Sequence, residues 1–261
     1  MTTPRPPLAL AFREAGQGAP VVLLHGLFGH AGNFGTIQRR LAQRFRVIAL
    51  DLCNHGASPH APTMSYPEMA ADVLATLSAQ GALPATLVGH SMGGKVAMAI
   101  AEAAPAMVAR LCVVDIAPRA YGAGFAGHVA AMAAVPLLPG LSRAQADRVL
   151  AEAEPDAGVR QFLLQNLRLD RDPPGWRIDL AAITASLAQL SAWVPDPAMR
   201  YRGPVLFIAG ARSRYIRAED RPAISARFPA AGFATIADAG HWVHAEAPEE
   251  FLRILGRFLE D

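Results

Sequence analysis

Ser91 lies in a segment whose residue types and spacing are suited to nucleophilic chemistry. Residues 86–95 read TLVGHSMGGK, in which an apolar run enters GHSMG and continues as a helical pattern. Serines in a G-x-S-x-G motif sit on a tight, strained turn between a strand and a helix, where side chains at the two glycine positions would collide. The helix N-terminus also favours developing negative charge. The motif alone is a weak signal, but its strand and helix context predicts that Ser91 is a nucleophile.

His241 is the candidate general base for this serine. It lies in DAGHWVHAEAP, residues 238–248, after the last predicted strand and before the last predicted helix. A base for this kind of nucleophile follows it in the chain order serine, acid, histidine. His244 is the nearest alternative, but it falls on the turn that begins the last helix. A metal site made by His241, His244 and Glu246 would need further ligands, and none stands at a recognisable spacing. We therefore expect no metal.

Acyl transfer also needs two N–H donors aimed at the oxyanion of the tetrahedral intermediate. One is the amide that follows the nucleophile, here that of Met92, and the other comes from a loop after an earlier strand. Residues 23–29 read LLHGLFG directly after a predicted strand. The amide of Leu27 is the first choice for the second donor, and that of Phe28 is the alternative. His25 is interpreted as a hydrogen-bonded part of the loop scaffold.

The elements that would position these residues are short apolar runs that alternate with longer helical patterns. This alternation predicts βαβ units and a mainly parallel sheet covered by helices on both faces. The carboxyl ends of such strands form one edge, where ligands bind. The predicted strands are 20–24, 46–50, 86–88, 111–114, 205–209 and 233–236, with an edge strand at 8–13; the predicted helices are 34–45, 66–80, 92–104, 218–228 and 249–259.

One interval interrupts the alternation. Residues 118–201 contain no strand-like run, and only helical patterns separated by prolines. A helical insertion between two strands of a parallel sheet predicts a lid over the strand ends. We expect a core made of residues 1–117 and 202–261, with the lid at 118–201 as an insertion rather than an independent domain. The helical patterns cover 125–134, 142–153, 158–167 and 180–193.

The composition argues against several classes of protein. Apolar residues make up 52% of the 261 residues and charged residues 18%, which supports a large core and argues against disorder. The net charge is +2 and no basic run is present, so we expect no nucleic-acid partner. The most apolar stretch, 129–141, is short for a membrane span and contains two prolines, and no signal segment begins the chain. We expect a soluble, cytoplasmic protein without membrane insertion.

Five segments together resemble the α/β-hydrolase superfamily. They read LLHGLFG, DLCNHGASP, LVGHSMGGK, VVDIAPR and AGHWVHAE. More narrowly they resemble its small esterase and acyl-CoA esterase branch, a bacterial group with mitochondrial relatives. The resemblance implies an α/β fold of the α/β-hydrolase type, with a mostly parallel central sheet covered by helices on both faces and a helical lid inserted after the sixth strand. One departure is Cys53, since the branch usually has arginine in D-x-R-N-H-G.

The acid of the expected triad does not stand where most of the superfamily carries it. That position follows the strand that returns from the lid, and here the turn at 210–214 reads GARSR, with Ser213 in place of an aspartate. Serine cannot stabilise the imidazolium that forms when the nucleophile loses its proton. Asp115 ends the strand after the nucleophile's helix, at the same edge as Ser91, and it precedes His241. The branch resembled places its acid at this strand end. The alternative is a turn or cap role at the lid entrance.

These observations predict a serine hydrolase that cleaves carboxylic esters or acyl thioesters through an acyl-enzyme. Ser91 is the expected nucleophile, His241 the base and Asp115 the acid. No cofactor is expected, the partner is a small acyl ester or thioester, and the chain is expected to be a monomer or a small homo-oligomer. The side chains expected to bind substrate are Phe28, Phe125 and Trp176.

Two alternatives to this function remain at the level of sequence. The first is carbon–carbon bond hydrolysis or perhydrolase chemistry on the same triad. The second is a non-catalytic small-molecule receptor of the same fold, because receptors can retain a triad. Dehalogenases and most epoxide hydrolases use an aspartate nucleophile, and Ser91 argues against both.

Overall fold

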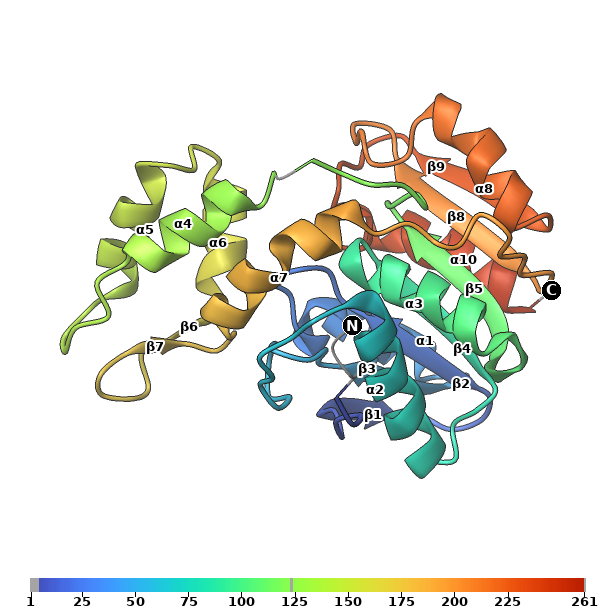
Figure 1. The fold of residues 1–261 in the computed structure, drawn as a ribbon, viewed down its shortest axis with the longest axis horizontal. Coiled ribbons are helices and arrows are strands. Elements are labelled where there is room, and N and C mark those ends of the chain that lie inside the picture. The colour runs from blue at the N-terminus through green and yellow to red at the C-terminus, as the bar shows by residue number, and fades with distance from the viewer. Residues whose placement is uncertain (1–4, 123, 261) are drawn as a thin grey trace.

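A seven-stranded sheet forms the centre of the computed structural model, which describes residues 5–122 and 124–260 (Figure 1). The strand order is β1-β3-β2-β4-β5-β8-β9, in which β1 is antiparallel to β3 and the other neighbours are parallel. The expected mostly parallel sheet is therefore confirmed. The strands are β1 Phe12–Ala15, β2 Pro20–Leu24, β3 Arg46–Leu50, β4 Ala85–His90, β5 Val108–Val114, β8 Val205–Gly210 and β9 Ala231–Ile236.

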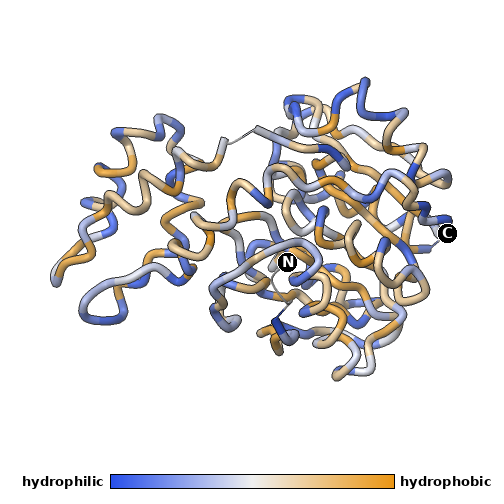
Figure 2. Tube along the Cα trace, in the orientation of Figure 1, coloured by the Kyte–Doolittle hydropathy of each residue, from blue (hydrophilic) through white to orange (hydrophobic). Residues whose placement is uncertain are grey.

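Side chains that alternate along the strands fill two separate cores, one on each face of the sheet. In β2, Val22 and Leu24 belong to one core, and Val21 and Leu23 to the other. Helices α2, α3 and α8 cover the first face, and α1 and α10 cover the second. Burial on both faces explains why the central strands are continuous apolar runs (Figure 2). These helices are α1 Gly35–Leu41, α2 Tyr66–Ala79, α3 Met92–Ala103, α8 Arg221–Arg227 and α10 Pro248–Glu260, and the short ones are η1 Ala31–Phe34, η2 Pro105–Met107, η3 Ala218–Asp220 and α9 Val243–Glu246.

The start of α2 is fixed by a reciprocal cap. The Ser65 hydroxyl accepts a hydrogen bond from the Glu68 amide, and the Glu68 carboxylate accepts one from the Ser65 amide at 3.0 Å. Such a capping box satisfies two N–H groups that have no partner within the helix. The cap also fixes the position of Tyr66, the first residue of α2, and this residue belongs to the site described below.

The edge strand begins later than expected. Residues 8–13 were predicted to form it, but β1 covers Phe12–Ala15. The amide of Leu8 donates instead to the Asp72 carboxylate at 2.7 Å, and that of Leu10 donates to the Thr76 hydroxyl at 3.0 Å. The segment before β1 is therefore fastened to side chains of α2 rather than to a neighbouring strand.

The segment between β5 and β8, here called the insertion, carries most of the departures from the sequence prediction. The insertion follows β5, the fifth strand along the described residues, whereas the prediction placed it after the sixth strand. The count is one lower because a single strand, β1, precedes β2 in the described residues. It also contains a short antiparallel pair, β6 with β7, whose two-residue strands are too short to leave an apolar run in the sequence. In Figure 1, α4, α5 and α6 form a lobe beside the sheet domain, and α7 leads back to it. The insertion elements are α4 Ala126–Ala134, α5 Arg143–Ala151, α6 Ala157–Leu164, β6 Leu167–Arg168, β7 Gly175–Trp176 and α7 Leu180–Ala192.

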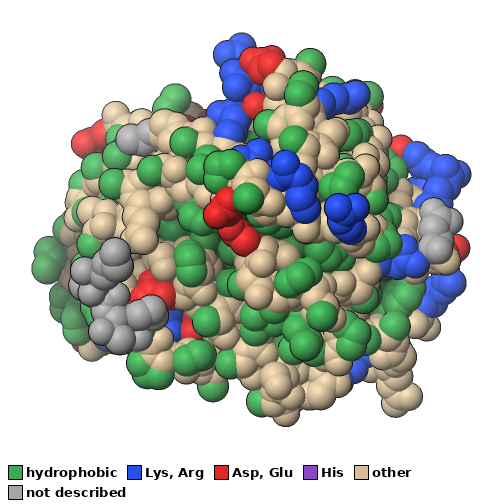
Figure 3. Space-filling model, turned by 45° about the vertical axis from the view of Figure 1, so that its right-hand side comes forward, with side chains coloured by type: hydrophobic (Ala, Val, Ile, Leu, Met, Phe, Trp, Pro, Cys, Tyr) green, Lys and Arg blue, Asp and Glu red, His purple; other side chains and the backbone are tan. Residues whose placement is uncertain are grey.

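The surface shows no obvious basic stripe on the face drawn in Figure 3, where Arg and Lys side chains are interspersed with acidic and apolar ones. Within residues 5–122 and 124–260, no helix combines the length and the apolar character needed to cross a membrane.

Candidate active site

Ser91 occupies a sharp turn between β4 and α3. Its backbone has φ 51° and ψ −116°, a conformation that strains any residue with a side chain. Both flanking glycines are required by close backbone contact. A Cβ at Gly89 would lie 2.2 Å from the Gly93 carbonyl oxygen, and one at Gly93 would lie 2.2 Å from that of Leu24. The strain at Ser91 is therefore held in place by the packing of α3 against β2 and β4.

Asp115 and His241 meet at the carboxyl edge of the sheet. Asp115 follows β5 directly, is fully buried, and its Oδ2 lies 2.8 Å from His241 Nδ1. The same oxygen accepts a hydrogen bond from the Ser213 hydroxyl at 2.5 Å, and Oδ1 accepts one from the Gly210 amide at 3.2 Å. The Asp115 backbone is held as well, since its amide donates to the Ile208 carbonyl at 2.8 Å. The carboxylate is thus fixed by β8 and directed at the imidazole.

Ser213 stands in the turn after β8 and faces the carboxylate from that side. Its hydroxyl donates to Asp115 and accepts a hydrogen bond from the Tyr215 amide at 3.2 Å. A residue at the end of β8 and a residue at the end of β5 therefore meet at one carboxylate oxygen. The serine at the position where most of the superfamily carries its acid is therefore a hydrogen-bond partner of the Asp115 carboxylate, which follows the neighbouring strand.

The His241 ring is enclosed by other rings. Tyr215 stacks on it with centroids 4.0 Å apart and an interplanar angle of 20°, and the His90 ring lies 4.7 Å away. His90 Nε2 donates to the His241 carbonyl at 2.8 Å. Burial lowers the pKa of His90 well below its usual range, and burial lowers that of His244 to about 3. Both neighbouring imidazoles are therefore neutral near pH 7.

The loop after β2 lies beside Ser91 in one cavity lining, and its backbone amides differ in their partners. The Phe28 amide donates to His55 Nε2 at 3.2 Å, so the alternative oxyanion donor is already occupied. Among the hydrogen bonds of residues 5–122 and 124–260, neither the Leu27 nor the Met92 amide is a donor to a protein group. His25 accepts from the Leu52 amide at 2.9 Å, in agreement with its interpretation as loop scaffold.

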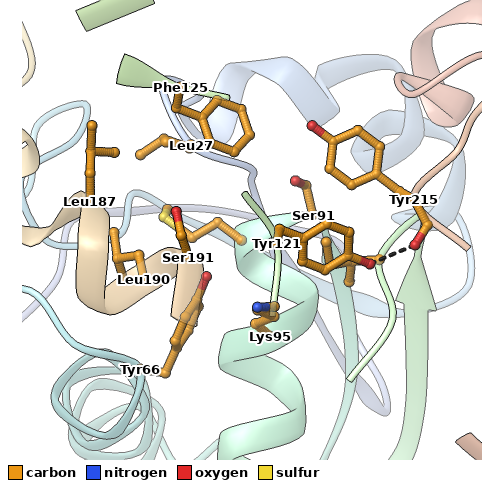
Figure 4. Close-up of a pocket in the computed structure, with 12 residues that line it drawn as sticks. Leu27, Tyr66, Ser91, Lys95, Tyr121, Phe125, Leu187, Leu190, Ser191 and Tyr215 are labelled. Carbon is orange, nitrogen blue, oxygen red and sulfur yellow. Dashed lines mark hydrogen bonds between the residues drawn. The ribbon is translucent and has the colours of Figure 1, made fainter. Parts of the chain in front are cut away.

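A narrow cavity opens between these amides and the insertion (Figure 4). Ser91, Leu27 and Met92 line it on the side of the sheet, and Phe125 and Leu187 line it on the side of the insertion. Polar groups also reach it. The polar lining residues that the sequence did not identify are Tyr66, Lys95, Tyr121, Ser191 and Tyr215, and the apolar ones are Ile116, Leu187 and Leu190.

Two of the three predicted substrate-binding side chains are absent from the lining of this cavity. Trp176 lies on β7, where its indole N–H donates to the Met132 carbonyl at 3.2 Å, so it packs within the insertion. Phe28 is only 2% exposed and contacts Phe125 edge to face, with centroids 6.2 Å apart. Only Phe125 reaches the cavity, with Phe28 packed against it.

Comparison with known proteins agrees with this architecture. A model of the alpha/beta hydrolase family matches residues 21–254. The chain belongs to the α/β-hydrolase family. It is 43% identical over 251 residues to an sn-1-specific diacylglycerol lipase, ABHD11, of Xenopus laevis, covering 93% of this chain and 80% of that one. It is 39% identical over 246 residues to the esterase YbfF of Escherichia coli, covering 94% of each chain. A solved structure of a marine microorganism esterase superposes with a TM-score of 0.93 at 34% identity, covering 96% of this chain and 99% of that one.

The resemblance to an esterase branch of the α/β hydrolases is thereby confirmed, and so is the expectation of an enzyme that hydrolyses carboxylic esters. Cys53, the departure from the branch pattern, is fully buried in this α/β hydrolase. Burial raises the pKa of its thiol to about 11, so it is a neutral core side chain.

The sequence contains signals for some of the cavity residues that the prediction missed. Lys95 stands four residues after Ser91, and residues at that spacing share one face of a helix. Tyr215 follows the GARSR turn, so its position near the acid could have been inferred once Asp115 was chosen. Leu187 and Ser191 lie on α7, and nothing in the sequence indicates which side of that helix faces the sheet.

Proposed function

We propose that this α/β hydrolase cleaves small carboxylic esters and acyl thioesters through a covalent acyl-enzyme on Ser91. The observation that carries the proposal is the 2.8 Å contact between His241 Nδ1 and Asp115 Oδ2 beside the strained serine turn. An imidazole held through Nδ1 has Nε2 free to accept the serine proton, and the carboxylate stabilises the imidazolium that results.

In the first half of the reaction, Ser91 Oγ attacks the acyl carbon while His241 takes the proton. The amides of Leu27 and Met92, which have no protein acceptor among the described residues, are available to the oxyanion. Collapse of this intermediate transfers the proton from His241 to the departing alcohol or thiol. In the second half, His241 activates a water that attacks the acyl-enzyme, and the serine is released with the acid product.

Within the described residues, no hydrogen bond joins the Ser91 hydroxyl to His241. Catalytic hydrogen bonds are often long without substrate and shorten in the Michaelis complex. We assign that contact to the substrate-bound state. The insertion acts as the lid in this proposal, since Phe125 and Leu187 close the cavity opposite Ser91 and exclude water from the reacting carbonyl.

The test is a panel of p-nitrophenyl esters and acyl-CoA thioesters of increasing chain length, combined with fluorophosphonate labelling. We expect multiple turnovers and labelling of the wild type, and loss of both in Ser91→Ala. The exposed Ser78 on α2 provides the matched control, because Ser78→Ala removes the same hydroxyl far from the cavity. Stoichiometric labelling without turnover of any ester would instead indicate a receptor.

A further inference from the structure

Lys95 is the only lysine in the sequence, and it lies in the wall of the cavity that contains Ser91. It is 2% exposed and stands on α3, one helical turn after the serine. Figure 4 shows its side chain beside Tyr66 at the end of the cavity away from Phe125. The proposed chemistry uses no amine there, so this side chain needs a separate explanation.

Within the described ranges, the Lys95 ammonium has no carboxylate partner. Its Nζ donates to the Trp193 carbonyl at 3.0 Å, and the Tyr66 and Tyr121 rings lie 5.5 and 5.0 Å away. Among the ion pairs of residues 5–122 and 124–260, none involves Lys95. Ammonium groups have three donors, and the part of the chain that the structure describes supplies one hydrogen-bond acceptor, beside a third ring, that of Trp193, at 5.6 Å.

Most of the other buried charges within residues 5–122 and 124–260 have a charged or imidazole partner. Asp72 lies 2.6 Å from Arg5, Asp220 lies 3.0 Å from Arg119, and Asp115 contacts His241. Pairing is the normal condition of a buried charge, because an isolated one loses its hydration without compensation. Among the described residues, Asp51 has no charged partner, but its carboxylate accepts hydrogen bonds from the Ala31 and Ala57 amides at 2.6 and 2.8 Å. Lys95 has one hydrogen-bond acceptor and lines a ligand cavity, which indicates that the ligand supplies an anion.

Two neutral donors accompany the ammonium. The hydroxyls of Tyr66 and Ser191 belong to the same cavity, and within the described part of the chain neither takes part in a hydrogen bond. Much of the remaining wall is apolar, including Ile116 and Leu190, and the Tyr121 hydroxyl is already bonded to the Tyr215 carbonyl. The cavity thus combines a nucleophile, walls suited to methylene groups and a cationic end with hydroxyl donors.

Resting on the proposed esterase function, we propose that the acyl pocket selects acyl groups that carry a second carboxylate, held by the Lys95 ammonium and the Tyr66 hydroxyl. The preferred substrates are then monoesters or monothioesters of short dicarboxylic acids. The chain length of the diacid follows from the spacing of the two residues on α3. Lys95 lies four residues after Ser91, a rise of about 6 Å along the helix, so we expect a short chain between the reacting carbonyl and the second carboxylate.

The charge of Lys95 gives the selectivity a characteristic pH dependence. Burial, together with the nearby Arg119, lowers the pKa of Lys95 to about 8. The ammonium that attracts the carboxylate is therefore present below this pKa and is lost as the pH rises through it. Burial raises the pKa of Tyr66 and of Tyr121 above their usual range, so both phenols stay neutral in that window, and His241 acts equally on charged and neutral substrates.

The test compares two substrates of matched shape, monoethyl glutarate and its neutral amide analogue ethyl glutaramate, by ethanol release. For the wild type at pH 6.5 we expect kcat/KM to favour the carboxylate by roughly 10- to 100-fold, the range for hydrogen bonds to charged groups. The ratio should fall toward one at pH 9.5. Lys95→Met should abolish the preference and Lys95→Arg should retain part of it. Removal of an exposed cation on α10, in Arg257→Met, should leave the ratio unchanged.

A wild-type ratio near one, with ready hydrolysis of neutral esters, would overturn the inference and assign Lys95 to holding the end of α7 through Trp193. Absence of turnover on every ester would contradict the proposed function itself, so the two failures are distinguishable. If Lys95→Met does not fold, the wild-type ratio at the two pH values decides the matter. A second readout is competitive inhibition by glutarate against pentanoate, which should favour glutarate at pH 6.5.

Discussion

Replacement of Asp115 by asparagine tests the proposed acid with the least change in shape. Asp115 Oδ1 accepts from the Gly210 amide, whereas Oδ2 accepts from both His241 and Ser213. Asparagine offers one oxygen and one NH₂ group. If its oxygen keeps the Gly210 contact, its NH₂ faces His241 and favours the tautomer with the proton on Nε2, which cannot accept the proton of Ser91. If the amide is reversed, two N–H donors oppose each other at Gly210.

Either orientation removes the carboxylate that stabilises the imidazolium, so we expect kcat to fall by about 10⁴-fold, the loss known for a triad aspartate changed to asparagine. This corresponds to about 5.4 kcal/mol in the activation free energy. The assay is steady-state hydrolysis of a p-nitrophenyl ester, with thermal unfolding to verify the fold. Asp238→Asn is the matched control, since that carboxylate is exposed and stands three residues before His241; it should retain nearly full activity.

The sharper form of the experiment restores a carboxylate from the other strand. The Ser213 hydroxyl lies 2.5 Å from the Asp115 oxygen that contacts His241. Ser213→Asp in the Asp115→Asn background should therefore recover part of the lost rate. Ser213→Ala alone should cost far less than Asp115→Asn, because the carboxylate keeps two other partners. Near-normal activity of Asp115→Asn would refute the reasoning and leave a serine–histidine dyad or another acid.

Three further outcomes are expected. Ser91→Ala and His241→Ala should reduce ester turnover to a similar floor, and the double variant should lose little more, because triad members act as a unit; additive losses in kcat would contradict this. Phe125→Ala should change the ratio of kcat/KM between short and long acyl chains by about 10- to 200-fold, whereas Trp176→Ala should lower only the melting temperature, since it packs within the insertion. Burial lowers the pKa of His244 to about 3, so its contribution to the free energy of unfolding is complete above about pH 6.5 and is lost as the pH falls toward 3. His244→Phe should therefore flatten the pH dependence of the free energy of unfolding measured in urea. An unchanged pH dependence in this variant would count against the assignment.

The sheet and the turn at Ser91 could be predicted because each follows from a local rule. Strands buried on both faces must be apolar throughout, as in β4, whose six residues are all buried. The glycines around Ser91 are forced by backbone contacts of 2.2 Å, which no other residue type permits. The contact between Asp115 and His241 also follows from topology, since both residues come after strands of the same parallel sheet.

The cavity lining could not be predicted in the same way. Trp176 and Phe125 are both aromatic residues of the insertion, yet only Phe125 faces the cavity. Which one does so depends on how the helices of the insertion pack on one another and beside the sheet domain, and amphipathic helices permit several such packings. The short strands β6 and β7 escaped prediction for a related reason, since two residues carry no periodicity.

The meeting of two strand ends at one carboxylate oxygen bears on how such a site can change its sequence without losing its chemistry. In the proposed triad the imidazole requires a negative charge at one point in space, and the shared contact predicts that a carboxylate at residue 115 or at residue 213 would supply it. Loss of the aspartate at 115 first would pass through an inactive protein. Gain of an aspartate at 213 first would place two carboxyl groups side by side, where mutual repulsion keeps one protonated and leaves a single charge for the histidine. If the aspartate at 213 is gained before the one at 115 is lost, every intermediate sequence keeps one carboxylate beside the histidine. The acid of the proposed triad can therefore change from one strand end to the other without an intermediate that lacks it.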